Sequence, residues 1–199
     1  MHPLIAPRDA PGSSDRLVVF VGHVIPDKGV GVLVDACGRI PDVHLVLVGP
    51  VAPEFAAGLA EAARGAKRGR WLDFRGAVSH DEALAEIARA AVFVLPSFDE
   101  AFPYVILEAM SLGTPIIASS VGAIPEMLSS ADGPCGVPVP AGDPLALEAA
   151  LRYLLSHPEE RRLIALRGRK KAACDYAPDK VAAGLAEIWR SAISFQTGA

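Results

Sequence analysis

Short apolar runs alternate with longer amphipathic segments over most of this chain. Most of the runs are rich in Val, Leu and Ile, which is typical of parallel strands covered on both faces. We predict strands over Leu17–Val21, Val43–Val48, Trp71–Arg75, Ala91–Leu95, Pro115–Ala118 and Gly136–Val139. The remaining pattern predicts helices over Val30–Ile40, Pro53–Arg64, His80–Arg89, Pro103–Leu112, Gly122–Leu128, Pro144–Leu155, Pro158–Ala173 and Pro178–Ile193.

Alternating strands and helices predict an α/β fold. The expected form is a doubly wound parallel sheet, Rossmann-like, of about six strands with helices on both faces. Gly22, Gly49 and Gly76 stand where predicted strands end, and ligands of such sheets lie off those carboxyl ends. The pair Gly29-x-Gly31 lacks the third glycine of a dinucleotide fingerprint, which argues against a dinucleotide-dependent dehydrogenase.

The length and the ends of the chain predict its domain organisation. A chain of 199 residues fits one domain, or one domain with a small appendage. Residues 1–15 hold three prolines, one glycine and two serines, so we expect a linker or disordered arm there. Residues 16–194 are predicted to form the folded domain.

Composition and charge exclude some classes of partner. The chain is 51% hydrophobic and 21% charged, which is typical of a globular protein. Its net charge of −4 argues against nucleic acid as a partner. Residues 64–70 and 161–171 are basic, and we interpret them as solvated helix faces. Peripheral contact with an anionic membrane surface or a lipid-phosphate acceptor is the alternative.

The cysteines and the N-terminus predict the cellular setting. Cys37, Cys135 and Cys174 are widely spaced and form no C-x-x-C pair, so neither a disulfide framework nor a zinc site is indicated. The N-terminus lacks the apolar run of a signal peptide, and no run approaches the roughly 18 residues of a membrane span. We therefore expect a soluble protein in a reduced, cytoplasmic setting.

The stretch Pro96–Met110, PSFDEAFPYVILEAM, carries the densest candidate chemistry. It joins a predicted strand to a helix in which Pro103 suits the first position, because its missing N–H costs nothing there. Glu100 and Glu108 flank that helix start, whose free amides attract phosphate. This order of acceptor, anion site and acceptor matches a sugar, a diphosphate and a ribose joined in series.

The string EAFPYVILEAMSLGTPIIAS, with Glu100-x7-Glu108, resembles the signature of the family 4 retaining glycosyltransferases of the GT-B fold. The resemblance runs from about residue 16 to about residue 191 and covers only the C-terminal, donor-binding half of such enzymes. It implies one half of a GT-B fold that binds a nucleotide diphosphate sugar. The nucleotide would be UDP, GDP or ADP, with no metal or other cofactor.

The resemblance implies two catalytic residues and a donor-binding set. Glu100 would face the donor sugar, and Lys28 would neutralise the diphosphate leaving group. A cation is unfavourable beside a helix N-terminus, which favours this role over that of a solvent-exposed lysine. Glu108 would hold the ribose, and the backbone near Val78 would read the base edge. The full donor-binding set is Gly22, His23, Val78, Ala101, Phe102, Pro103, Tyr104, Val105 and Glu108.

Three positions depart from the family's pattern. His23 stands where the family usually has an Arg, and a neutral imidazole offers one hydrogen bond but no fixed charge. Ala101 replaces a glycine, which is tolerable if φ there is negative. Ala123 replaces the second glycine of a pair whose first member, Gly122, remains.

Other polar residues have more than one interpretation. Glu126 is equally consistent with a site acid and with a surface residue on a short helix. Ser97 and Ser119 follow predicted strands, and we interpret them as helix caps rather than as pocket residues. No D-x-D pair, G-x-S-x-G elbow, P-loop or H-E-x-x-H pair stands out, which fits metal-independent chemistry.

The leading hypothesis is the donor-binding domain of a retaining, metal-independent glycosyltransferase of hexosyltransferase type. It would pass a sugar from a nucleotide diphosphate to an acceptor hydroxyl, and the acceptor site would belong to a missing N-terminal domain. The isolated chain would then show little or no turnover. A second hypothesis is a non-enzymatic, partner-dependent subunit that binds nucleotide sugar. A GT-B epimerase or phosphorylase is a third, disfavoured by the short chain.

Overall fold

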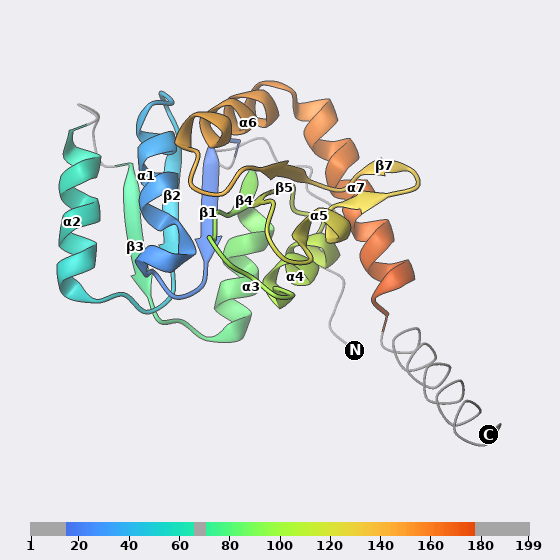
Figure 1. Cartoon of the computed structure of the whole chain (residues 1–199), viewed down its shortest axis with the longest axis horizontal. Coiled ribbons are helices and arrows are strands. Elements are labelled where there is room, and N and C mark those ends of the chain that lie inside the picture. The colour runs from blue at the N-terminus through green and yellow to red at the C-terminus, as the bar shows by residue number, and fades with distance from the viewer. Residues whose placement is uncertain (1–14, 66–70, 178–199) are drawn as a thin grey trace, which may run out of the picture.

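The structure, a computed structural model, describes residues 15–65 and 71–177 (Figure 1). At its centre is a six-stranded, wholly parallel sheet in the order β3-β2-β1-β4-β5-β8. The prediction of a doubly wound sheet is confirmed, and every strand end lies within one residue of its predicted place. The strands are β1 (Leu17–Val21), β2 (His44–Val48), β3 (Leu72–Gly76), β4 (Val92–Leu95), β5 (Ile116–Ser119) and β8 (Val137–Val139).

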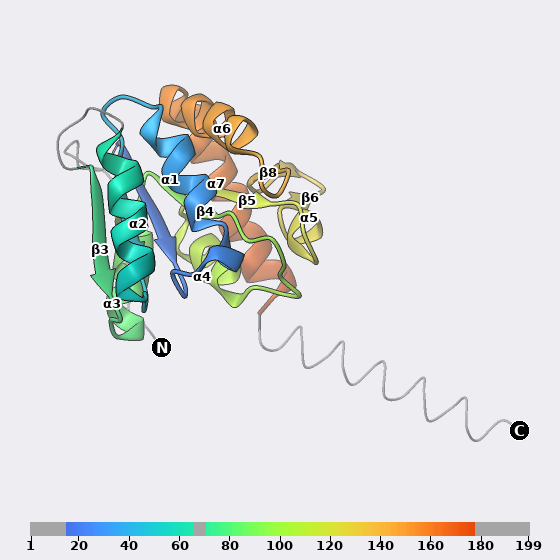
Figure 2. The same ribbon diagram turned by 60° about the vertical axis from the view of Figure 1, so that its left-hand side comes forward.

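Helices cover both faces of the sheet, as predicted (Figure 2). On one face α1 lies between α2 and α6, and on the other α4 lies between α3 and α7. A short 3-10 helix, η1, precedes α1. The helices are η1 (Pro26–Lys28), α1 (Val30–Gly38), α2 (Pro53–Arg64), α3 (His80–Arg89), α4 (Tyr104–Leu112), α5 (Ile124–Met127), α6 (Pro144–Ser156) and α7 (Pro158–Asp175).

The structure differs locally from the prediction at the start of α4 and after α5. Pro103 is not the first residue of α4 but its N-cap, with an extended backbone at φ −75° and ψ 109°. A small antiparallel pair, β6 (Ser129–Ser130) and β7 (Gly133–Pro134), lies between α5 and β8. Strands of two residues are too short to show a period, so the sequence pattern does not indicate them.

Some predictions fall outside the described residues. The helix predicted over Pro178–Ile193 lies there, as do residues 1–14 of the predicted arm. The domain bounds at residues 16 and 194 therefore stay predictions.

Alternate residues of β1 and β2 belong to two separate clusters of the hydrophobic core. Val18 and Phe20 of β1 belong to the larger cluster, whereas Val19 packs with Val46 and Val48 of β2 in the smaller one. All five side chains are fully buried. Burial on both faces explains why these strands show apolar runs rather than alternation.

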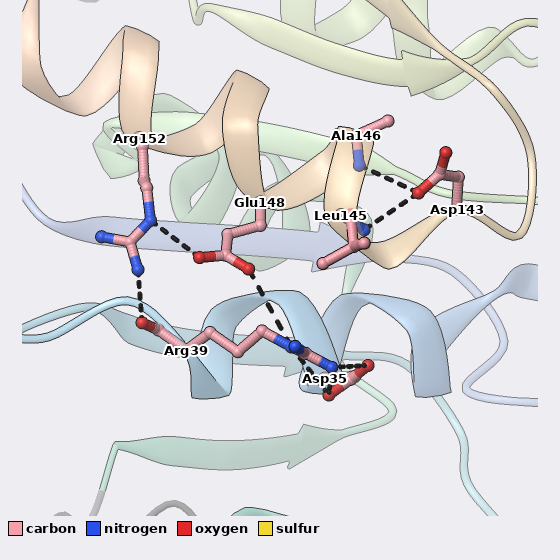
Figure 3. A network of polar contacts seen from close by, with 7 residues as sticks. All are labelled: Asp35, Arg39, Asp143, Leu145, Ala146, Glu148 and Arg152. Carbon is pink, nitrogen blue, oxygen red and sulfur yellow. Dashed lines mark hydrogen bonds and ion pairs between the residues drawn. The ribbon is translucent and has the colours of Figure 1, made fainter.

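A polar network on the surface joins α6 to α1 (Figure 3). Asp143 caps the start of α6, where its Oδ1 accepts hydrogen bonds from two backbone amides. One turn apart, Arg152 and Glu148 pair at 2.8 Å, and Arg152 donates to the backbone carbonyl of Arg39 after α1. Arg39 itself pairs with Asp35 at 3.0 Å. Such surface pairs are individually weak, and two contacts connect α6 to the end of α1: Arg152 with the Arg39 carbonyl, and Glu148 with the Arg39 side chain at 3.9 Å.

The order of the strands determines where a ligand can bind. β1 and β4 are neighbours, while β2 and β3 extend the sheet on one side and β5 and β8 on the other. The chain direction across the sheet therefore reverses between β1 and β4. The loops that follow these two strands separate at this switch point, and open α/β sheets bind their ligands in the crevice so formed.

Candidate functional site

A pocket of about 290 Å³ lies at the switch point, between the carboxyl ends of β1 and β4. Seven of the eleven residues proposed from the sequence line it, so residues from distant parts of the chain are brought together. Its lining consists of Phe20, Val21, Gly22, His23, Lys28, Leu95, Glu100, Pro103, Val105 and Glu108.

Four proposed residues do not line the pocket with the rest. Val78 lies on the exposed loop after β3, and Ala101 is exposed before α4. Phe102 and Tyr104 turn their rings to the surface, where the two contact each other edge to face at 6.0 Å. The Phe102 ring also meets Tyr176, whose pKa is raised by burial of the phenol. A donor contact of Phe102 or Tyr104 would therefore come from the backbone.

The start of α4 offers free backbone donors. Because Pro103 is the N-cap, the amides of Tyr104 and Val105 have no carbonyl oxygen one turn earlier in the helix. Within the described part of the chain these two amides, and that of Phe102, donate no hydrogen bond to the protein. Free amides and the helix dipole together make a local anion site.

Lys28 and Glu100 form a close ion pair beside this helix start. The Lys28 ammonium lies 2.6 Å from Glu100 Oε1, although the two residues are 72 positions apart. The hydroxyl of Ser97 donates to the same oxygen at 2.8 Å. The two charged side chains are 28% and 14% exposed, so the pair is largely shielded from water but still reaches the pocket.

The loop that carries Glu100 is clamped on both sides. On one side Gly29 packs on the chain so closely that a Cβ there would lie 2.0 Å from the carbonyl oxygen of Pro96. On the other side a Cβ at Gly122 would lie 1.6 Å from the carbonyl oxygen of Glu100. Both glycines have positive φ, +64° and +51°, which side chains disfavour. The backbone of residues 96–101 thus has little freedom to move.

Glu108, in the second turn of α4, faces α3. Its Oε1 lies 3.6 Å from Nε2 of His80, the first residue of α3. The Glu108 side chain is 32% exposed and that of His80 is 66% exposed, so the contact is open to water. Sequence reasoning did not single out His80 for the site. The signal available in the sequence was its position, because His80 follows Val78, the residue predicted to read the base, by only two positions.

A capping box holds the loop after β3. Ser79 accepts from the amide of Glu82, and the Glu82 carboxylate accepts from the amide and the hydroxyl of Ser79 at 2.8 and 2.7 Å. The hydroxyl and then the amide of Ser79 hold the pKa of Glu82 below its ordinary value. Ser79 and Glu82 have the residue types and the spacing of a capping box, and this box fixes the backbone at the end of the segment that contains Val78.

The interpretation of the two serines as helix caps is wrong. The N-cap of α4 is Pro103, and Ser97 instead bonds the Glu100 carboxylate from a fully buried position. Ser119 is also buried, and α5 begins after a different N-cap, Ala123. Spacing alone does not reveal the partner of Ser97, because that contact depends on the path of the loop between β4 and α4.

The structure also bears on Ala101 and Glu126, whose roles the sequence left open. Asp42 is the only non-glycine residue of the described chain with positive φ, so Ala101 meets the condition under which the methyl group is tolerated. Glu126 is exposed on α5 and does not line the pocket.

The described residues contain no cluster of three or more His, Cys, Asp or Glu side chains placed to hold a metal ion. Cys37 and Cys135 are buried and Cys174 is exposed, and none of the three forms a disulfide. Within the same residues, no helix combines the length and apolar character needed to cross a membrane.

A comparison with family models decides the family. The model of the glycosyl transferases group 1 matches residues 15–157, which is most of the chain and includes the whole pocket lining. The chain belongs to the glycosyl transferases group 1. The resemblance seen in the sequence is thereby confirmed, and the group 1 structures similar to this chain have the GT-B fold.

Relatives of known name and structure define how much of a group 1 protein is present. The chain is 33% identical to the MMP alpha-(1->4)-mannosyltransferase of Mycolicibacterium hassiacum, over 90% of this chain but 44% of that protein. It superimposes on sucrose-phosphate synthase from Thermosynechococcus elongatus with a TM-score of 0.79 and 28% identity, over 92% of this chain and 47% of that one.

A third relative matches over most of its own length. The C-terminal domain of the group 1 protein LpcC from Francisella tularensis shares the fold, with a TM-score of 0.72 and 23% identity. The match covers 81% of this chain and 86% of that domain. The chain thus spans about half the length of the longer relatives and corresponds to one half of a GT-B fold.

Proposed function

We propose that this chain is the donor-binding half of a retaining, metal-independent glycosyltransferase. It binds a nucleotide diphosphate sugar, and together with an acceptor-binding unit it passes the sugar to an acceptor hydroxyl with retention. The observation that carries the proposal is the assembly of Lys28, Glu100, Glu108 and the free amides at the start of α4 around one pocket.

The leaving group is stabilised by positive charge and amides. Departure of a nucleoside diphosphate leaves negative charge on its phosphate oxygens. The Lys28 ammonium lines the pocket together with Val105, and we expect it to meet that charge jointly with the free amides of Tyr104 and Val105 at the start of α4. The helix fixes the amides before the reaction, which lowers the cost of reorganisation in the transition state.

The two carboxylates hold the sugar and the ribose. Glu100 accepts hydrogen bonds from hydroxyls of the donor sugar, and Glu108 accepts from those of the ribose. A carboxylate offers two oxygens and up to four acceptor sites, so each matches a pair of neighbouring hydroxyls. The backbone near Val78, beyond Glu108 and His80, reads the edge of the base.

The acceptor site belongs to a second domain or a partner subunit. This assignment rests on the extent of the match, because the chain covers 44% of the mannosyltransferase relative. The chain alone therefore binds nucleotide but transfers sugar slowly or not at all. Efficient transfer by this chain without a partner contradicts that part of the proposal.

The first test is titration calorimetry of the chain with UDP, GDP and ADP. We expect one of the three to bind, with affinity about 10-fold or more lower in Glu108→Ala, because a hydrogen bond to a charged group is worth about 1.5–3 kcal/mol. Glu159→Ala removes an exposed carboxylate on α7 and serves as the control. Binding of none of the three nucleotides contradicts the proposal, as does an equal effect of the two substitutions.

A further inference from the structure

Ser97 is one of three buried polar side chains among the described residues, and it is fully inaccessible to water. It follows β4 by two positions and does not itself line the pocket. Its hydroxyl donates to Glu100 Oε1 at 2.8 Å. A buried hydroxyl is costly unless it is hydrogen-bonded, so this bond gives the serine a fixed partner.

The contacts of the Glu100 carboxylate are asymmetric. Ser97 and Lys28 both donate to Oε1, at 2.8 and 2.6 Å. No residue in the described parts of the chain donates to Oε2. One oxygen therefore anchors the carboxylate to the protein, and the other is left for a ligand in the pocket that Glu100 lines.

The two donors to Oε1 differ in their freedom to leave it. Lys28 has a long, flexible side chain that is 28% exposed, and its ammonium is attracted to any diphosphate bound at the start of α4. Ser97 has a short side chain on a backbone segment held between Gly29 and Gly122. When the ammonium turns to a diphosphate, the serine is the donor that stays.

We propose that Ser97 is a positioning residue that keeps the Glu100 carboxylate directed at the donor sugar while Lys28 binds the diphosphate. The inference rests on the proposed function, because it assumes that Glu100 accepts from the sugar. It goes beyond that function by assigning a role to a residue outside the pocket. It also explains why this buried position holds a serine, whose hydroxyl needs a hydrogen-bond partner, rather than an alanine, which needs none.

The test compares each nucleoside diphosphate with its sugar ester on Ser97→Ala. Calorimetric titrations use UDP with UDP-glucose, GDP with GDP-mannose, and ADP with ADP-glucose. We expect Ser97→Ala to weaken binding of the diphosphate sugar about 5- to 10-fold and that of the bare diphosphate less than about 2-fold. Ser97→Thr keeps the hydroxyl and should bind the diphosphate sugar as tightly as the unaltered chain does. A purely structural role of Ser97 affects both ligands equally.

Three further variants complete the comparison: Ser119→Ala, Glu100→Gln, and Glu100→Gln combined with Ser97→Ala. Ser119→Ala removes the other buried serine at this edge of the sheet and leaves both affinities unchanged. In a Glu100→Gln background, adding Ser97→Ala causes no further loss, because the serine acts through that carboxylate. Thermal unfolding of every variant shows that the chain still folds.

The possible failures are distinguishable. If the unaltered chain binds none of the three diphosphates, the proposed function is overturned and this inference with it. If a diphosphate binds but Ser97→Ala weakens it and its sugar ester equally, or weakens neither, only the inference is overturned. The inference alone is also overturned if Glu100→Gln still binds the sugar ester more tightly than the bare diphosphate, by the same factor as the unaltered chain.

Discussion

The two ends of the pocket are built differently. At one end, the clamped end, Lys28 and Ser97 donate to one oxygen of Glu100 at 2.6 and 2.8 Å, and the Glu100 side chain is 14% exposed. At the other, the open end, Glu108 meets His80 at 3.6 Å, and the two side chains are 32% and 66% exposed. Charge at the clamped end is prearranged, whereas the open end keeps weak contacts that a ligand can replace.

This difference follows the division of work in the proposed function. Stabilising a leaving group requires charges whose positions are set before the reaction, and a shielded, clamped site provides them. Holding a nucleoside requires only that hydrogen bonds form on binding, and exposed groups can supply them at little desolvation cost. The comparison therefore predicts larger effects when the protein's own contacts at the clamped end are broken than when the contact of His80 or the capping box at the open end is broken.

The largest effect is expected for Gly122→Ala, which breaks the clamp. The new methyl would lie 1.6 Å from the carbonyl oxygen of Glu100, at a φ of +51°. We expect the free energy of unfolding to fall by on the order of 3 kcal/mol, and sugar-nucleotide binding to be lost with the displaced loop. Urea denaturation measures the first effect and calorimetry the second.

Gly31→Ala is the matched control for that change. Gly31 lies in α1, and a Cβ there meets nothing within 4 Å. Alanine favours a helix over glycine, so stability should stay the same or rise by up to about 1 kcal/mol. Equal losses for the two variants would show that the loop of Glu100 is not clamped at Gly122.

A smaller but still large effect is expected for Lys28→Met, which removes the charge and keeps the length of the side chain. Affinity for the nucleoside diphosphate should fall roughly 10- to 100-fold, because a charged hydrogen bond to phosphate is lost. Lys170→Met is the control, since its partner Asp132 lies on the surface, with side chains 65% and 54% exposed. Unchanged affinity in Lys28→Met would show that Lys28 does not contact the diphosphate.

At the open end, Ser79→Ala removes the capping box and should lower the free energy of unfolding by about 1 kcal/mol. The effect should depend on pH, because Ser79 lowers the pKa of Glu82. Stabilisation by a carboxylate with a lowered pKa is present above its ordinary pKa and is lost as pH falls through the lowered one. Denaturation curves at several pH values should show that the difference in the free energy of unfolding between the unaltered chain and Ser79→Ala becomes smaller in acid.

The smallest effect is expected for His80→Gln. The side chain is 66% exposed, and glutamine can still donate to Glu108, so unfolding should change by less than about 0.5 kcal/mol. Nucleoside diphosphate affinity should change less than in Lys28→Met. A loss as large as that of Lys28→Met would show that the open end is as strictly arranged as the clamped end, and the comparison would fail.

Much of the fold was predictable because its signals are local. A strand buried on both faces leaves a continuous apolar run, as in β1, and the Ser79–Glu82 capping box spans only four residues. Glu100 and Glu108 were recognisable for the same reason, since both lie in one short string. The hairpin of β6 and β7 was missed because each strand has two residues and leaves no period.

The contacts that define the site could not be predicted in this way. Nothing in the sequence pairs Lys28 with Glu100 across 72 positions, or sets Gly122 against the carbonyl of Glu100. The role of Ser97 was misread as a helix cap for the same reason, because its partner depends on the path of the loop. The nearness of His80 to Glu108 depends on how α3 packs beside α4.

The sequence by itself thus determined the alternation of strands and helices, the family and the two acids of the pocket, because each depends on neighbours in the chain. Only the tertiary structure decided which groups share an oxygen, which loop is clamped and which end is open. These properties arise where β1 and β4 lie side by side, and the sheet order that makes them neighbours results from packing among all of its strands.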